Sequence, residues 1–307
     1  MPRLRTVLAT AAVLLAAGIA LLYRPDVAPE ALRARYAPPP SRFVRVGGMD
    51  VHYRDEGTGP AVVLLHGMGG SLHTWDGWTA ALHDSLRVLR VDLPGYGLTG
   101  PFPHGDYRNA AYVAFLDAFL DTLGVRQASI AGNSMGGEIA WRYTLAHPAR
   151  VERLILLDAA GYPYGDPPPL FRVLGTPGLS ALLTKLSPRW MYRQNLTQVY
   201  VDDAKITEPL IDRYYDLTRR TGNREAFLRR ALVSDSFPFA AVRGVRAPTL
   251  IQWGAGDLWI PRAMADTFAA YIPNSRVVMY DSVGHLPMEE IPARSAADAR
   301  RFLLDGR

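Results

Sequence analysis

The fold of this chain is decided by the nine residues SIAGNSMGG at positions Ser129–Gly137. They follow a short apolar run, typical of a strand buried on both faces, and precede a helical pattern over residues 135–147. Glycines two residues before and after Ser134 permit a sharp strand-to-helix turn in which Cβ atoms would clash. This turn exposes the serine hydroxyl above a sheet, at a helix N-terminus. We predict that Ser134 is a nucleophile, supported by Gly132 and Gly136.

A serine hydroxyl needs a base, and the base needs an acid to orient it. For a turn of this kind the expected chain order is serine, acid, histidine. Asp257 comes just past the end of one predicted strand, and His285 just past the end of the next. All three groups then project from the same edge of a parallel sheet, which predicts the catalytic triad Ser134, Asp257 and His285. Asp158, which also ends a predicted strand, is the alternative acid.

The donors for an oxyanion are expected in the glycine-rich segment HGMGG at His66–Gly70. Its glycines, beginning with Gly67, let backbone N–H groups approach a substrate oxygen. We predict that the N–H groups of Met68 and Met135 form the oxyanion hole. His66 is predicted to fix the loop through hydrogen bonds and not to act as the base.

Strand-like and helix-like segments alternate along the chain, which predicts an α/β fold with a doubly wound, mostly parallel sheet. A hairpin around Gly47-Gly48 comes first, formed by residues 42–46 and 50–54. The predicted buried strands are residues 61–65, 87–93, 128–131, 154–157, 249–253 and 276–280. The predicted helices are residues 107–123, 135–147, 263–272 and 291–304.

The alternation stops between residues 161 and 240, where amphipathic helical patterns rich in aromatic residues replace it. We interpret this stretch as a helical cap over the edge of the sheet where ligands bind. Its clustered arginines, which run from Arg219 to Arg230, are predicted to form a solvated face. The predicted domains are a membrane anchor with a Pro-rich stalk (1–41), a first core part (42–160), the cap (161–240) and a second core part (241–307).

The N-terminus carries Arg3 and Arg5, followed by an uncharged stretch over residues 6–23. Eighteen helical residues span about 27 Å, close to the hydrocarbon thickness of a bilayer. We therefore predict an N-terminal apolar helix that anchors the chain in a membrane. The two arginines favour a cytoplasmic N-terminus, so the body is predicted to be periplasmic or extracytoplasmic. The alternative is secretion after cleavage near Gly18-Ile19-Ala20.

Composition narrows the classes of function. The chain has 307 residues, 49% of them hydrophobic and 21% charged, which excludes disordered, collagenous and polytopic membrane proteins. It has no cysteine, which excludes a thiolate metal site and a cysteine nucleophile. Of the net charge of +5, residues 1–42 carry +4, from six arginines against two acids. The basicity therefore does not mark a nucleic-acid surface. We predict no nucleic-acid partner, no metal and no cofactor.

Taken together, these motifs resemble the α/β-hydrolase fold superfamily over residue 42 to the C-terminus. The resemblance is carried by His66–Gly69, Asp92–Gly97, Gly132–Gly137, Asp257 and Gly284-His285. With the apolar N-terminal segment added, the chain is similar to bacterial membrane-anchored α/β hydrolases of unassigned substrate. The resemblance implies the α/β-hydrolase fold and a Ser-His-Asp hydrolase that works without a cofactor.

We therefore expect a carboxylesterase- or lipase-like serine hydrolase that cleaves carboxylic esters with an apolar part through an acyl-enzyme. Haloalkane dehalogenases and epoxide hydrolases carry an aspartate where this chain has Ser134. The run Gly132–Gly137 is similar to that of carbon–carbon bond hydrolases of ring-fission products. Those enzymes, however, follow the histidine with tryptophan and glutamine, whereas this chain has Leu286-Pro287-Met288-Glu289. A perhydrolase or haloperoxidase-like activity and a non-catalytic ligand-binding protein are the further alternatives.

Overall fold

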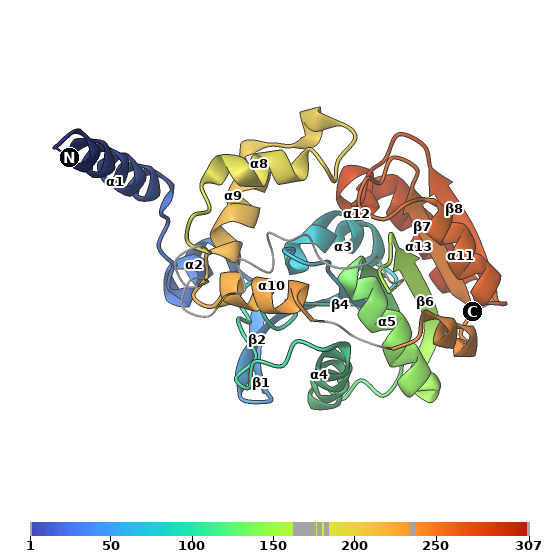
Figure 1. Cartoon of the computed structure of the whole chain (residues 1–307). Helices are drawn as coiled ribbons and strands as arrows, with labels where there is room; N and C mark the ends of the chain where they lie inside the picture. Colours follow the sequence, from blue (N-terminus) through green and yellow to red (C-terminus); the bar gives the residue numbers. More distant parts are fainter. Residues whose placement is uncertain (1, 162–175, 177–179, 181–183, 234–236, 306–307) are drawn as a thin grey trace.

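An eight-stranded sheet forms the centre of the computed structural model, which describes residues 2–161, 176, 180, 184–233 and 237–305 (Figure 1). The strands are β1 (Arg42–Val46), β2 (Met49–Glu56), β3 (Ala61–Leu65), β4 (Arg87–Val91), β5 (Ala128–Asn133), β6 (Val151–Leu157), β7 (Thr249–Gly254) and β8 (Ser275–Tyr280). They are arranged in the order β1-β2-β4-β3-β5-β6-β7-β8. The pairs β1–β2 and β2–β4 are antiparallel, and all other neighbouring pairs are parallel. The predicted mostly parallel sheet is confirmed.

Helices cover both faces of this sheet, so each face has its own hydrophobic core. One face packs against α4 (Asn109–Thr122), α5 (Met135–Ala146) and α11 (Ala263–Tyr271). The other packs against α3 (Asp76–Leu82), α12 (Pro287–Glu290) and α13 (Pro292–Leu304). In β3, Val62 and Leu64 join one core, while Val63 and Leu65 join the other. Successive side chains of a strand point to opposite faces, which explains the continuous apolar run.

The crossover from β3 to β4 contains a helix that the sequence analysis does not predict. It begins with the 3-10 turn η1 (Leu72–Trp75) and continues as α3. The rings of Trp75 and Trp78 are fully buried here and meet edge to face, with 5.0 Å between their centroids. A helix of seven residues is too short to show a clear helical period in the sequence, which is why the sequence does not predict it. A helix this short is also unstable alone, and the packing of the two tryptophans stabilises it.

The chain between β6 and β7 contains the segment predicted as a cap. Its described helices are α8 (Arg189–Leu196), η3 (Asp203–Lys205), α9 (Glu208–Thr218), α10 (Asn223–Ala231) and η4 (Phe239–Gly244). Residues 162–175, 177–179, 181–183 and 234–236 lie outside the described residues. The boundaries of the cap therefore stay a prediction, as do those of the other domains.

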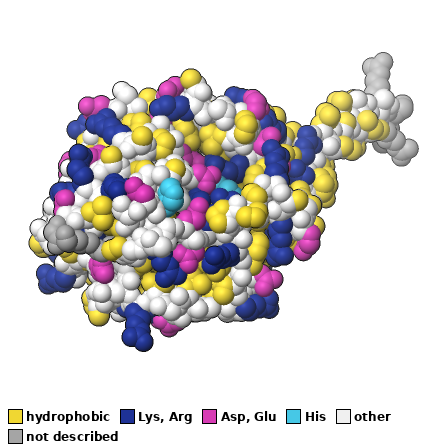
Figure 2. Space-filling view, turned by 180° about the vertical axis from the view of Figure 1, so that it is seen from behind, with side chains coloured by type: hydrophobic (Ala, Val, Ile, Leu, Met, Phe, Trp, Pro, Cys, Tyr) yellow, Lys and Arg dark blue, Asp and Glu magenta, His cyan; other side chains and the backbone are white. Residues whose placement is uncertain are grey.

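The first helix, α1 (Pro2–Leu22), projects from the body of the molecule (Figure 1). Side chains such as Val7, Leu14 and Leu21 are exposed, and Figure 2 shows hydrophobic side chains along this projection. Among the residues that the structure describes, no helix combines the length and the apolar character needed to cross a membrane. The structure therefore does not support the predicted membrane anchor.

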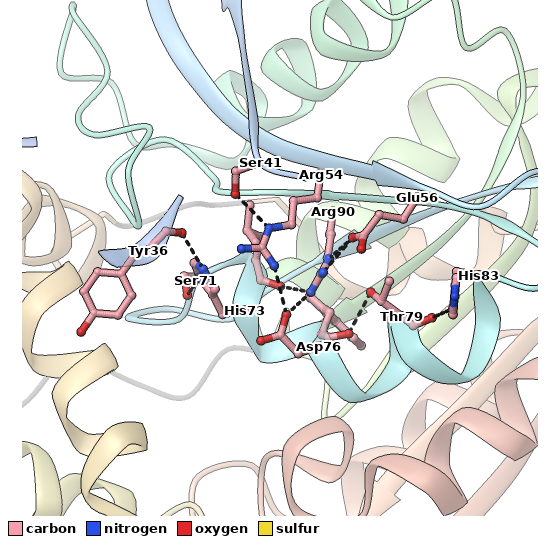
Figure 3. Close-up of polar contacts among 12 residues, drawn as sticks. Tyr36, Ser41, Arg54, Glu56, Ser71, His73, Asp76, Thr79, His83 and Arg90 are labelled. Atoms are coloured by element: carbon pink, nitrogen blue, oxygen red, sulfur yellow. Dashed lines mark hydrogen bonds and ion pairs between the residues drawn. The ribbon is translucent and has the colours of Figure 1, made fainter. Parts of the chain in front are cut away.

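Residues 24–41, predicted as a stalk, are packed against the body. This segment contains the helix α2 (Pro29–Tyr36), whose Leu32 and Tyr36 are buried against Leu98 and Leu217. Further hydrogen bonds join this segment to η1 and to β2 (Figure 3). His73 Nε2 donates to the carbonyl oxygen of Tyr36 over 2.8 Å, and Nε of Arg54 donates to the Ser41 hydroxyl over 2.9 Å.

Candidate active site

Ser134 lies at a sharp turn between β5 and α5, as the sequence predicts for a nucleophile elbow. Its backbone angles, φ 53° and ψ −119°, are rare for a residue with a side chain. Its N–H donates to the carbonyl oxygen of Leu157 at the end of β6, and its own carbonyl accepts from the N–H of Ala160, both over 3.0 Å. The neighbouring strand therefore holds the strained turn in place.

The two glycines flanking Ser134 are required by close backbone contacts. A Cβ on Gly132 would lie 2.2 Å from the carbonyl oxygen of Gly136. A Cβ on Gly136 would lie 2.2 Å from the carbonyl oxygen of Leu65, at the end of β3. Side chains at these two positions would push α5 away from β3 and β5, and the turn would not form.

His285 and Asp257, which come from loops after β8 and β7, form a buried hydrogen-bonded pair. Nδ1 of His285 lies 2.7 Å from Oδ2 of Asp257. The other oxygen of Asp257 accepts from the N–H groups of Trp259 (2.7 Å) and Ile260 (3.0 Å). Because a carboxylate can only accept, Nδ1 carries a proton, and in the neutral form of the ring Nε2 carries the lone pair.

The loop that carries His285 is held by residues that the sequence analysis missed. The N–H of His285 donates to the carbonyl of Val199 (2.8 Å), and its carbonyl accepts from Nδ2 of Asn133 (2.9 Å). The buried Glu290 accepts from the N–H of Gly284 over 2.7 Å and from two backbone N–H groups of the cap. The sequence gives one indication for Asn133, its position next to Ser134. No sequence pattern points to Glu290, because two of its partners are almost 90 residues away in the chain.

The alternative acid, Asp158, lies next to this pair but does not bond His285. Its Oδ1 accepts from the N–H of Gly254 over 2.9 Å. Burial raises the pKa of Asp158 well above its usual value, and the negative charge of Asp257 raises it further. The folded structure therefore favours the protonated form of Asp158. One ligand atom each of Asp158, Asp257 and His285 lie within 4.8 Å of one another. In this structure Nδ1 of His285 and Oδ2 of Asp257 are already hydrogen-bonded to each other, so this pair of atoms does not offer two free ligands to a metal ion.

The glycine-rich loop after β3 runs directly past Ser134. A Cβ on Gly67 would lie 3.1 Å from Cβ of Ser134. His66 is buried, its Nδ1 lies 2.8 Å from the carbonyl of Gly67, and its Nε2 accepts from the N–H of Leu93 over 3.0 Å. Burial lowers the pKa of His66, so the ring is neutral in this role. These contacts hold the loop in which Met68 lies. Met135 is the first residue of α5, where N–H groups have no partner inside the helix.

Strand order explains why these two loops meet. β3 lies between β4 and β5, so the connections after β3 and after β5 leave the sheet on different sides. Ligands bind at such a switch point, beyond the carboxyl ends of the strands. Ser134 and His285 line a cavity of about 450 Å³ at this edge, together with Gly67, Met68 and residues of the cap. Most of the cap residues that line it are apolar, among them Leu186, Met191, Leu196, Val199, Phe227 and Leu228.

The cap arginines do not form the solvated face that the sequence analysis predicts. Arg229 is exposed, but Arg224 is buried and lines the cavity. Arg230 is mostly buried too, and it lies 3.2 Å from the carboxylate of Glu138 on α5. Helical periodicity could not show this, because the acidic partners come from distant parts of the chain.

Residues 60–292 match the model of the alpha/beta hydrolase fold family, and the chain therefore belongs to that family. The chain is 32% identical over 266 residues to 2-hydroxy-6-oxononadienedioate/2-hydroxy-6-oxononatrienedioate hydrolase 2 of Pseudomonas putida, which covers 80% of this chain and 90% of the relative. A membrane phospholipase A, described as a bacterial virulence factor, is similar in structure, with a TM-score of 0.72 and 27% identity over 99% of this chain and 98% of the other. The enol-lactonase from Burkholderia xenovorans LB400 has a TM-score of 0.73 and 25% identity, over 86% of this chain and 100% of the other. The predicted resemblance is confirmed, and the protein is an enzyme of the α/β-hydrolase type.

Proposed function

We propose that this protein is a serine hydrolase that cleaves carboxylic esters with an apolar acyl or alcohol part. One observation carries the proposal: His285, which is paired with the buried Asp257, and the elbow residue Ser134 border the same largely apolar cavity. Apolar walls with a few convergent polar groups are typical of a site for a small organic substrate. The phospholipase and the enol-lactonase that resemble this structure are named for cleavage of ester-type bonds.

In the proposed mechanism, Ser134 Oγ attacks the ester carbonyl while Nε2 of His285 accepts its proton. Asp257 holds the ring in the tautomer that leaves Nε2 free, and it stabilises the imidazolium that forms. The negative charge on the carbonyl oxygen is stabilised by the N–H groups of Met68 and Met135. The imidazolium then protonates the leaving alcohol, which departs and leaves an acyl-enzyme on Ser134. Water, deprotonated by His285, attacks this acyl group in the second half of the reaction.

The proposal is tested by a fluorophosphonate probe and by hydrolysis of p-nitrophenyl esters of increasing chain length. The wild-type protein is expected to be labelled on Ser134 and to prefer esters with an apolar acyl chain. Ser134→Ala is expected to abolish labelling and to lower kcat by about 10⁴-fold or more. Ser187→Ala, which removes another hydroxyl lining the same cavity, is the matched control and should keep the label. Full ester hydrolysis by Ser134→Ala would exclude the assignment.

A second candidate function is hydrolysis of a carbon–carbon bond in a ring-fission product. It is favoured by the 32% identity to the Pseudomonas putida enzyme and by the run Gly132–Gly137. The residues after His285 count against it, because Leu286-Pro287 stands where tryptophan and glutamine are expected. Turnover of a 2-hydroxy-6-oxo-dienoate distinguishes the two functions. It is measured as the loss of the substrate's visible absorbance. Turnover of the dienoate with no turnover of esters would replace the first proposal by the second.

We also propose that the body of the protein works outside the cytoplasm, held at the membrane or released from it. The support is the order of the N-terminal residues, two arginines followed by an uncharged stretch over residues 6–23. Cell fractionation of the full chain tests the location, and N-terminal sequencing of the mature protein tests retention. A mature start at Leu21 would show cleavage, and recovery of the body in the cytoplasm would contradict the proposal.

A further inference from the structure

One charged side chain of the cap lies in the wall of the cavity. Among the lining residues that the structure describes, Arg224 is the only arginine, lysine or carboxylate. Its side chain is only 5% exposed, so bulk water can hydrate little of the guanidinium. A buried guanidinium needs an anionic partner and hydrogen-bond acceptors, because removing a charge from water is costly.

The partner of Arg224 is Asp26, a residue of the segment that follows α1. Oδ1 of Asp26 accepts from Nη2 of Arg224 and, over 3.2 Å, from its Nε. Nη1 of Arg224 donates to the Ser187 hydroxyl over 2.8 Å, and Ser187 lines the cavity as well. Oδ2 of Asp26 accepts from Nζ of Lys185 over 2.6 Å. Each nitrogen of the guanidinium therefore has a partner, and the Nε–Nη2 side, which could hold a carboxylate through two hydrogen bonds, is bound to Asp26.

The segment around Asp26 is fixed to the cap by backbone hydrogen bonds. The N–H of Arg24 donates to the carbonyl of Lys185, and the N–H of Val27 donates to the carbonyl of Arg219, both over 2.8 Å. The N–H of Thr221 donates back to the carbonyl of Val27 over 3.0 Å. Asp26 is thus held in place by the chain on both of its sides, and it contributes a fixed negative charge beside the cavity wall.

We propose that Asp26 is a specificity-determining residue, which occupies Arg224 and thereby makes the cavity select uncharged apolar substrates over substrates with a carboxylate. The inference rests on the proposed function, since it concerns the substrate of the same site. Arginine binds carboxylates through two parallel hydrogen bonds. With Asp26 in place, a substrate carboxylate would find the Nε–Nη2 side of Arg224 already bound and the charge of Arg224 offset by that of Asp26. Without the Asp26 charge, Arg224 would be a cation in an apolar pocket, and an acidic ligand would be its best available partner.

The test compares two p-nitrophenyl esters of similar length, the neutral pentanoate and the acidic half-ester of glutarate. The wild-type enzyme is expected to prefer the pentanoate. In Asp26→Asn, the ratio of kcat/KM for the glutarate to kcat/KM for the pentanoate is expected to rise at least tenfold. Adding Arg224→Gln to Asp26→Asn should return the ratio to the wild-type range, because the freed cation is then absent. A folded Asp26→Asn variant with an unchanged ratio would overturn the inference.

Asp216→Asn is the matched control. Asp216, on α9, also binds the N-terminal segment, through Arg35 (2.8 Å) and the Tyr36 hydroxyl (2.8 Å). It does not line the cavity, so its replacement weakens the docking of that segment but leaves Arg224 paired. The substrate ratio of Asp216→Asn should therefore equal that of the wild type. A rise as large as in Asp26→Asn would show that docking, and not the Asp26 charge, sets the preference.

A binding measurement separates this inference from the proposed activity. In the Ser134→Ala background, octanoate and octanol are titrated by calorimetry at pH 7. Asp26→Asn is expected to tighten binding of octanoate about tenfold and to leave octanol unchanged. If the wild type cleaves no ester but octanoate binding shifts in this way, the proposed function fails and the charge selection stands. If esters are cleaved but neither the ratio nor octanoate binding moves, the inference fails alone.

Discussion

The side-chain amide of Asn133 donates a hydrogen bond to the backbone carbonyl of His285, with 2.9 Å between the two atoms. The same amide lies 3.2 Å from the carbonyl of Leu157 at the end of β6. Asn133 immediately precedes Ser134, so this contact joins the strand of the proposed nucleophile to the loop of the proposed base across 152 residues. The distance between serine and histidine is therefore set by a buried hydrogen bond and not only by the packing of the sheet.

Replacing Asn133 by alanine is expected to misplace His285. The buried carbonyl of His285 loses its side-chain donor, and the carbonyl of Leu157 keeps only the N–H of Ser134, which costs about 1–3 kcal/mol of unfolding free energy. A shift of about 1 Å between reacting groups can lower the rate about 100-fold, so kcat should fall by one to two orders of magnitude. The measurements are ester kinetics and chemical denaturation. An Asn133→Ala variant with wild-type kcat would show that the contact has no positioning role.

The two neighbouring carboxyl groups of the site should respond very differently to amidation. Asp257→Asn leaves His285 facing an amide that can turn its N–H toward Nδ1 and favour the wrong tautomer. Its kcat is expected to fall by about 10⁴-fold. Burial raises the pKa of Asp158 well above its usual value and so favours its neutral form, and Asp158→Asn supplies a neutral group of the same shape. Its kcat should stay within a few-fold of the wild type. A reversed order of the two effects would make Asp158 the orienting acid.

We expect the difference in unfolding free energy between Asp158→Asn and the wild type to depend on pH. Because the folded-state pKa of Asp158 is raised, folding favours its protonated form. Stability is unaffected by this group below its unfolded pKa, near 4, and decreases as the pH rises toward the folded-state pKa. Asp158→Asn removes that loss. The variant should match the wild type near pH 3.5 and become more stable relative to it as the pH rises, by at most about 1.4 kcal/mol per pH unit. Urea unfolding at several pH values measures the difference, and a gap that narrows with rising pH would contradict the assignment.

For Asp92 we expect the opposite pH dependence of the unfolding free energy. Burial alone would raise its pKa, but the charge and hydrogen bond of His52 hold the pKa of Asp92 well below its usual value. Its oxygens also accept from the N–H groups of Leu72 and Leu98, both over 2.7 Å. Such a group stabilises the fold above its unfolded pKa and loses the effect as the pH falls toward the folded-state pKa. Asp92→Asn is expected to lower the unfolding free energy by about 3–5 kcal/mol at pH 7, and less below pH 4.

Asp121→Asn is the control for the Asp92 measurement. Asp121 is an exposed partner of Arg150, and a surface ion pair of this kind contributes about 1 kcal/mol or less. Its replacement should shift the urea midpoint only slightly and with little dependence on pH. A loss at Asp121 as large as that at Asp92 would indicate a general charge effect and not the buried network.

The sequence by itself determined those parts of the fold and site that depend on local pattern. Continuous apolar runs identified the buried strands, because a strand covered on both faces cannot alternate with polar residues. The glycines around Ser134 identified the elbow, since a Cβ at Gly132 or Gly136 would overlap neighbouring backbone. Asp257 and His285 could be proposed because parallel strands end at one edge, wherever they lie in the chain.

Only the tertiary structure decided which charged groups face each other. The sequence could not show that Asp26 pairs with Arg224, because no local pattern around either residue indicates its partner. The same holds for Glu290 and for the docking of residues 24–41 on the body. The short helix α3 was missed for a related reason, since packing of Trp75 and Trp78 stabilises it more than its own period does. Local sequence sets the backbone and the face that is buried, but the electrostatics of the cavity depend on contacts between residues up to 198 positions apart.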